Sequence, residues 1–139
     1  MEENIKGVHV LLITPENEII LQQKTLDYKP NPGMISMFGG GVESGESPLD
    51  VLKRELFEEL QLELNRYEVK TLGTYYKTRE LDGVEYGVQV YIVKNVGSKN
   101  LPLHEGERII VEKPENLLLN QKVTRITNLA IRDLINRGK

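Results

Sequence analysis

The chain begins with two short apolar runs that are separated by turn-forming residues. Residues 7–14 (GVHVLLIT) and 18–24 (EIILQQK) are rich in apolar and β-branched side chains, and Pro15-Glu16-Asn17 lies between them. This order predicts a β-hairpin. Residues 25–33 then hold two prolines and a glycine, which interrupt both helices and strands. We expect this stretch to be a surface loop that faces a ligand.

The hydrophobic period changes after Ser47. Four leucines follow at three- and four-residue steps: Leu49, Leu52, Leu56 and Leu60. This spacing predicts an amphipathic helix over residues 47–60 with the leucines along its buried side. The start of the helix agrees, because Ser47 suits the N-cap, Pro48 the first position and Asp50 the positive end of the helix dipole.

The second half of the chain predicts further strands and another helical stretch. Residues 67–77 and 84–94 alternate as strands do, and Asp82-Gly83 supplies the tight turn of a second hairpin. Residues 108–112 predict a shorter strand. After Pro114 the apolar residues return to helical spacing as far as Asn136, and they are Val123, Ile126, Leu129 or Ala130, and Leu134. There is no internal repeat, so 139 residues predict a single domain over residues 1–139.

Composition narrows the class of protein. Apolar residues make up 39% and charged residues 28% of the chain, which is typical of a globular protein. The sequence contains neither a signal-peptide pattern nor an apolar run long enough for a membrane span, so we expect a cytoplasmic protein with no membrane partner. Eighteen basic and 21 acidic residues give a net charge of −3, which argues against a long nucleic acid as the partner.

The absence of cysteine limits the chemistry that the chain can perform. With no cysteine and only two histidines, His9 and His104, disulfides, thiolate zinc sites and cysteine nucleophiles are excluded, so carboxylates must carry any metal chemistry. Three of them, Glu55, Glu58 and Glu59, lie at i, i+3 and i+4 of the predicted helix and share one face. Like charges at this spacing repel each other unless a cation lies among them.

Two interpretations of this acidic face remain open at this point. Taken alone, three glutamates are also typical of an ordinary solvated helix face. A divalent cation would instead relieve their repulsion, and oxygen ligands without histidine or cysteine favour Mg²⁺ or Mn²⁺ over zinc. Arg54, four residues before Glu58, is placed to orient that carboxylate through an ion pair.

The residues upstream of the helix favour the second interpretation. Gly39, Gly40 and Gly41 are expected to lie in a loop before the helix, where the lack of side chains lets the backbone approach a phosphate or a metal closely. The spacing of this region resembles the signature of the Nudix hydrolase family: Gly40, five residues, Glu46, seven residues and then Arg54-Glu55-Leu56-Phe57-Glu58-Glu59. The resemblance departs at Gln61, where the family has a glycine that ends the helix, and at Phe38, where many members have proline.

The resemblance implies a fold and an activity. The expected fold is α/β, a Nudix-type α/β/α sandwich around a mixed β-sheet. The expected reaction is hydrolysis of the diphosphate linkage of a nucleoside diphosphate derivative by attack of water on phosphorus, with Mg²⁺ or Mn²⁺ as cofactor. The partner is then a small nucleotide substrate, and a homodimer is possible. If Gln61 takes the left-handed conformation of the usual glycine, it costs about 1 kcal/mol without loss of a ligand.

The resemblance also assigns roles to residues. The implied metal ligands are Glu55, Glu58, Glu59 and the Gly39 carbonyl. The residues that support these ligands are Arg54 and Glu46. The platform for the diphosphate is formed by Gly39, Gly40 and Gly41. The family draws its general base, or a further metal ligand, from a glutamate beyond the motif. Glu105 is the first candidate, with Glu107 and an ordinary exposed acid as the alternatives.

Several features leave alternatives open. His104 is either solvated or a donor to phosphate, and His9 is expected to be structural because it alternates with valines on the first strand. Five tyrosines either pack between strands or stack on a base: Tyr28, Tyr75, Tyr76, Tyr86 and Tyr91. Nucleoside triphosphates, dinucleoside polyphosphates, ADP-ribose and nucleotide sugars all share the diphosphate. A non-catalytic module of the same fold that senses a nucleotide or nucleotide sugar is the alternative to an enzyme.

Overall fold

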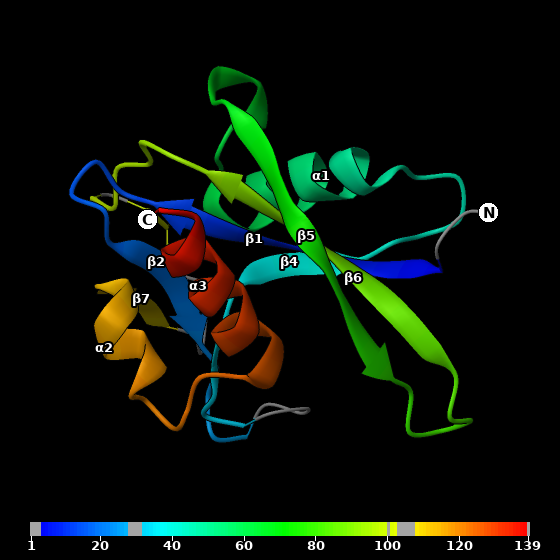
Figure 1. The fold of residues 1–139 in the computed structure, drawn as a ribbon. Coiled ribbons are helices and arrows are strands. Elements are labelled where there is room, and N and C mark those ends of the chain that lie inside the picture. The colour runs from blue at the N-terminus through cyan, green and yellow to red at the C-terminus, as the bar shows by residue number, and fades with distance from the viewer. Residues whose placement is uncertain (1–3, 28–31, 100, 103–107, 139) are drawn as a thin grey trace.

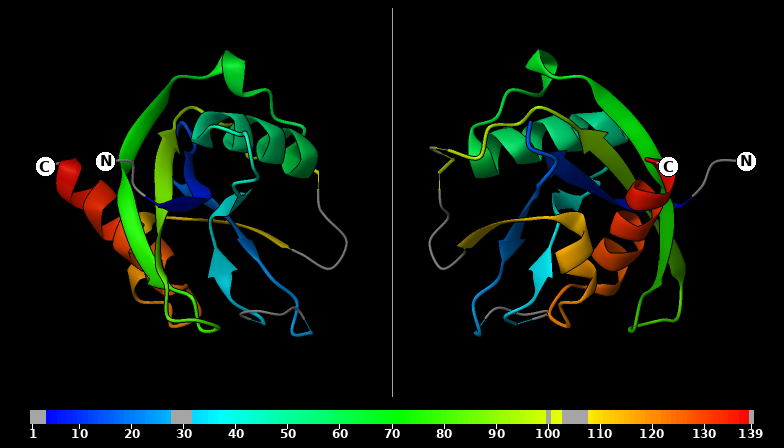
Figure 2. Two further views of the ribbon diagram at one scale, coloured as in Figure 1. Left: turned by 90° about the vertical axis from the view of Figure 1, so that its right-hand side faces the viewer. Right: turned by 60° about the vertical axis from the view of Figure 1, so that its left-hand side comes forward.

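The computed structural model describes residues 4–27, 32–99, 101–102 and 108–138, which form a mixed β-sheet with helices on both faces (Figure 1). The two hydrophobic cores lie on opposite faces of the sheet, one under α1 and one under α2 and α3 (Figure 2). The predicted α/β/α arrangement is therefore confirmed. Tyr28, His104, Glu105 and Glu107 lie outside the described residues.

Strand β1 (Ile5–Ile13) lies at the centre of the sheet. It pairs in parallel with β6 (Glu85–Val93), which pairs antiparallel with β5 (Val69–Thr78). On its other side, the last residues of β1 pair antiparallel with β2 (Ile19–Gln23), which also pairs with β7 (Arg108–Glu112). Both predicted hairpins, β1–β2 and β5–β6, are confirmed.

The glycine run differs from the sequence-based expectation. We expected a loop, but residues Phe38–Gly41 form strand β4, which pairs antiparallel with β1. A Cβ atom on Gly39 would collide with the carbonyl oxygen of Val8 on β1. The glycine therefore allows the two backbones to lie close together. The two-residue strand β3 (Ile35–Ser36) precedes β4 and pairs with β2.

Helix α1 (Pro48–Leu60) has the predicted ends. Ser47 and Asp50 form a capping box at its start, and Gln61 follows its end in the left-handed conformation with φ of 53°. The prediction that Leu49 is buried is wrong, because its side chain is 48% exposed and Val51 is buried in its place. Leu49 belongs to the first turn, whose capping residues Ser47 and Asp50 are exposed as well.

The C-terminal region folds as two helices, α2 (Pro114–Leu118) and α3 (Arg125–Arg137). Val123 is buried but precedes α3, where it forms an isolated bridge with Ile35. Of the two alternatives for the buried face of α3, Ala130 is buried, whereas Leu129 is 36% exposed. The helical period continued through the loop before α3, so periodicity alone placed the start of this helix too early.

Helix α3 is tied to β5 by polar contacts as well as by its apolar face. The Tyr75 hydroxyl donates to Asp133, and the Arg137 guanidinium donates to the carbonyl oxygens of Thr71 and Leu72. Burial and the hydrogen bond to Asp133 raise the pKa of Tyr75. None of the described helices is long and apolar enough to cross a membrane.

Candidate active site

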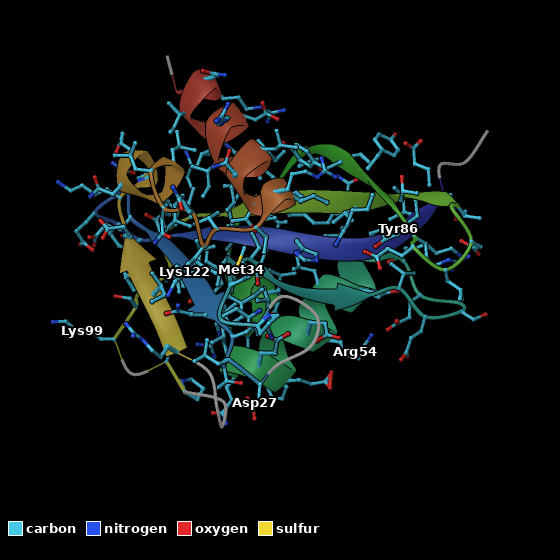
Figure 3. All side chains as sticks on the ribbon, turned by 90° about the horizontal axis from the view of Figure 1, so that it is seen from below. Asp27, Met34, Arg54, Tyr86, Lys99 and Lys122 are labelled. Carbon is cyan, nitrogen blue, oxygen red and sulfur yellow. The ribbon has the colours of Figure 1, made fainter. Side chains whose placement is uncertain are left out.

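The central residue of the acidic helix face is a cation, Arg54. Its guanidinium contacts three carboxylates: Glu46 at 3.0 Å, Glu55 at 3.1 Å and Glu58 at 3.2 Å. The contact with Glu46 is bidentate, because Nε donates to Oε2 and Nη2 donates to Oε1. Figure 3, which views the molecule from below, labels Arg54 on helix α1. Arg54 thus joins the loop before the helix to two successive turns of the helix.

Hydrogen bonding dominates the electrostatics of this cluster. The bonds with Glu46 are the largest cause that raises the pKa of Arg54, and they are also the largest cause that lowers the pKa of Glu46. The backbone N–H of Glu43 donates a further bond to Glu46 at 3.1 Å. Glu46 is therefore held as a carboxylate whose two oxygens are both bonded.

The Glu55 side chain lies against the glycine strand. A Cβ atom on Gly40 would overlap the Glu55 carboxylate, so the absent side chain of Gly40 provides the space for it. Because Gly40 pairs with Val8 on the central strand, this carboxylate lies against a strand that is paired with the centre of the sheet. The sequence motif thus brings Gly40 and Glu55, 15 positions apart, into contact.

The other two glutamates differ in exposure. Glu58 is exposed and Glu59 is half-buried, so the three acids do not form one solvated face. Within the described part of the chain, no three acidic or histidine side chains converge closely enough to hold a metal ion as they stand, and the guanidinium of Arg54 lies among the carboxylates. The donors nearby are all oxygen atoms, a donor set that fits Mg²⁺ or Mn²⁺ rather than zinc.

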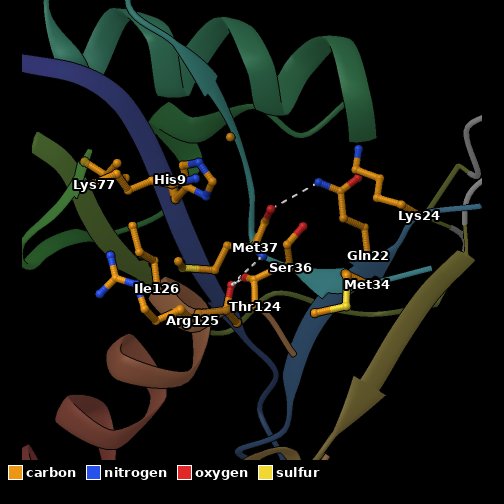
Figure 4. A pocket seen from close by; sticks show the side chains of 13 residues that line it. His9, Gln22, Lys24, Met34, Ser36, Met37, Lys77, Thr124, Arg125 and Ile126 are labelled. Atoms are coloured by element: carbon orange, nitrogen blue, oxygen red, sulfur yellow. Dashed lines mark hydrogen bonds between the residues drawn. The ribbon is translucent and has the colours of Figure 1, made fainter. Parts of the chain in front are cut away.

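Gly39 of strand β4 also forms part of the wall of a cavity of about 400 Å³ (Figure 4). It lies where β1 and β2 diverge and is closed on one side by the start of α3. Among its lining residues, Met34, Met37, Val88 and Ile126 are apolar. Lys24, Lys77 and Arg125 bring positive charge, and the described lining includes no acidic side chain.

Two polar side chains of the cavity wall have buried atoms without a hydrogen-bond partner among the described residues: His9 Nδ1 and Gln22 Oε1. Burial, with smaller contributions from Lys77 and Lys24, lowers the pKa of His9 to about 4, so its ring is neutral near pH 7. Gln22 is 4% exposed, and its Nε2 donates to the carbonyl oxygen of Met37 at 3.1 Å.

The structure brings together most of the residues that the motif singled out. Glu46, Arg54, Glu55 and Glu58 form one cluster, and Gly40 adjoins it. The cavity residues Gln22, Lys77 and Arg125 were not predicted from the sequence, because three residues on separate elements form no motif. His9 lies on the central strand as expected, but its side chain also lines the cavity. None of the described tyrosines lines this cavity.

Comparisons with known proteins agree with this architecture. A family model described as the NUDIX domain matches residues 3–127. A search of curated proteins finds no match. Among solved structures, the MutT protein of Methanosarcina mazei Go1 superposes with a TM-score of 0.77 at 16% identity, covering 100% of this chain and 99% of that one.

Two proteins of E. coli are also similar. The ORF135 protein has a TM-score of 0.76 and 23% identity, with 96% of this chain and 90% of that one covered. The dihydroneopterin triphosphate pyrophosphohydrolase has a TM-score of 0.75 and 14% identity, with 96% and 98% covered. At these identities the likeness shows a shared fold.

Proposed function

This chain belongs to the NUDIX domain family and is a hydrolase of that family, and we propose that it cleaves the diphosphate linkage of a small nucleotide derivative with the help of Mg²⁺ or Mn²⁺. The observation that carries this proposal is the contact of Arg54 with Glu46, Glu55 and Glu58 beside the glycine strand. An ordinary solvated helix face does not need a close contact such as that between Glu55 and Gly40.

Glu55, Glu58, Glu59 and the carbonyl oxygen of Gly39 are the groups that would hold the metal. When bound, a divalent cation supplies charge neutralisation at the phosphoryl oxygens and lowers the pKa of a bound water. Arg54 positions Glu55 and Glu58 while Glu46 anchors it, so the ligands are oriented before a substrate arrives. Glycines 39–41 leave the backbone open to the diphosphate.

The proposal also includes a general base. Glu105 remains the first candidate and Glu107 the second, and both lie outside the described residues. Unchanged turnover and unchanged metal affinity in both Glu105→Gln and Glu107→Gln would exclude these two glutamates from the mechanism. A cytoplasmic location and a homodimer likewise remain predictions.

The cavity beside Gly39 is the natural place for the organic group of the substrate. It is continuous with the glycine strand, and its volume is in the range of small-ligand sites. The exposed cations Lys77 and Arg125 favour a negatively charged ligand there. A nucleotide fits this combination of an apolar wall, buried polar atoms and positive charge.

A panel of substrates tests the proposal. We would measure release of phosphate or pyrophosphate from nucleoside triphosphates, dinucleoside polyphosphates, ADP-ribose and nucleotide sugars with Mg²⁺, Mn²⁺ or EDTA. Cleavage of at least one class that depends on the metal is expected. Tight binding of a nucleotide without any product, in the presence of either metal, would instead support the sensing module.

A further inference from the structure

Gln22 lines the cavity with a side-chain amide of fixed orientation. Its Nε2 donates to the Met37 carbonyl oxygen, which is an acceptor only, so the orientation of the amide is determined. The Oε1 atom is buried and has no partner among the described residues. A buried acceptor of this kind is costly until a donor reaches it, so a ligand that supplies one is favoured.

The fold explains why Gln22 lines a cavity rather than packing against a neighbouring strand. β1 and β2 pair only at Leu12 with Ile20 and at Ile13 with Ile19, and they then diverge. The chain from β3 to β4 passes between them, pairing first with β2 and then with β1. Gln22 extends across this gap to Met37 (Figure 4), and its Oε1 has no hydrogen-bond partner in the described part of the chain.

The chemistry of Oε1 selects among ligand groups. Oε1 is an acceptor only, so a ligand carbonyl placed against it would be repelled. An amino group offers donors and avoids that repulsion. The neutral ring of His9, whose buried Nδ1 also lacks a partner among the described residues, adds a second polar atom to the same wall.

We propose that Gln22 determines specificity by accepting, at Oε1, a hydrogen bond from an exocyclic amino group of the nucleobase held in this cavity. The inference rests on the proposed function and narrows it, because it assigns the substrate to nucleotides whose base carries an amino group. Lys77 and Arg125 lie at the exposed rim of the same cavity, where the phosphates of such a nucleotide leave it. Arg125 is anchored there by its bond to the Tyr76 carbonyl oxygen at 2.7 Å.

Pairs of substrates that differ by one amino group test this inference. We would compare kcat/KM for ATP with purine riboside triphosphate, and for GTP with inosine triphosphate. The wild type is expected to prefer the amino-bearing member of at least one pair by about tenfold or more, because its loss leaves Gln22 unpaired. In Gln22→Met the ratio of the two kcat/KM values is expected to fall to about twofold or less. Gln22→Glu, which keeps an acceptor oxygen, is expected to retain a preference.

Gln23→Met is the matched control. It makes the same change at the next position of β2, where the side chain donates to the Gly33 carbonyl oxygen and is absent from the cavity wall. Its preference is expected to equal that of the wild type. Equal kcat/KM for both members of both pairs in the wild type would overturn the inference without any variant, as would a preference that survives in Gln22→Met.

Binding without metal separates this inference from the proposed function. In EDTA, calorimetry on the wild type and the three variants would compare AMP with purine riboside monophosphate, and GMP with inosine monophosphate. A preference for the amino-bearing nucleotide that disappears only in Gln22→Met supports the role of Gln22 even if no substrate of the panel is cleaved. Metal-dependent cleavage combined with equal binding within both pairs rejects the role of Gln22 and leaves the hydrolase intact.

Discussion

Arg54 and Glu46 form a two-bond ion pair that joins the loop before α1 to the helix itself. Nε and Nη2 of Arg54 each donate to a different oxygen of Glu46 at 3.0 Å. A guanidinium can make such a planar, parallel pair, whereas the ammonium of lysine acts as a point charge. The remaining nitrogen, Nη1, is thereby aimed at Glu55 and Glu58.

Arg54→Lys is expected to reduce kcat/KM by about 10- to 100-fold because it removes an outer contact that orients the proposed metal ligands. The free energy of unfolding should change little, since Arg54 is partly exposed. Steady-state kinetics and urea unfolding check this. Arg66→Lys, at an exposed pair with Glu63 at 3.7 Å, is the matched control, and wild-type activity in Arg54→Lys would contradict the prediction.

Glu46 should make the protein more sensitive to acid. Its pKa in the folded protein is lowered, first by the hydrogen bond from Arg54, so protonation favours the unfolded chain. The stabilisation is present above the ordinary pKa of 4.5 and is lost as the pH falls through the lowered value. Thermal unfolding of Glu46→Gln is expected to depend less on pH below about 4.5 than that of the wild type. Glu16→Gln, in the exposed turn after β1, serves as the control; equal pH slopes in Glu46→Gln and the wild type would refute this role.

Gly40→Ala tests the contact between the glycine strand and the helix. The added methyl group would displace the Glu55 carboxylate, so we expect a loss of activity together with a destabilisation of about 1–3 kcal/mol. Metal-dependent turnover and urea unfolding measure the two effects. Gly97→Ala adds the same methyl group where nothing lies within 4 Å, and it should behave as the wild type. Full activity in Gly40→Ala would show that Glu55 does not need its present position.

Glu58→Gln is expected to lower kcat on the order of 10²–10³-fold, because it removes a charge that is proposed to hold the cation near the developing negative charge. The fold should persist, since this side chain is exposed. Turnover with Mg²⁺ and calorimetric binding of Mn²⁺ check the two halves of the expectation. Glu63→Gln, an exposed acid beyond the helix, is the control, and a fully active Glu58→Gln, Glu59→Gln double variant would remove both residues from the mechanism.

Gln61→Gly is expected to stabilise the protein by about 0.5–1 kcal/mol, because the residue already adopts the left-handed conformation that glycine enters without strain. Activity should stay unchanged, since Gln61 contributes only backbone bonds to the end of α1. The midpoint of thermal unfolding measures the gain. Gln121→Gly, at an exposed position without a positive φ, should bring no such increase. A lower midpoint in Gln61→Gly would contradict this account of the helix end.

The sequence by itself determined the local structure of α1 and the residues of the acidic cluster. The capping residues Ser47 and Asp50, the left-handed Gln61 and the approach of Arg54 to Glu58 all depend on neighbours within a few positions. Such features follow from short-range sterics and hydrogen bonding, so the pattern of residue types is enough to predict them. The spacing of the motif was likewise enough to indicate the family.

Only the tertiary structure decided the rest. The glycine run became a strand because β1 lies alongside it, and Leu49 is exposed because burial depends on what covers a turn rather than on its angular position. The cavity that Gln22 lines exists because β1 and β2 diverge and the chain from β3 to β4 passes between them. These outcomes depend on contacts between segments far apart in the chain, and the free energy of such contacts is not encoded in any local spacing.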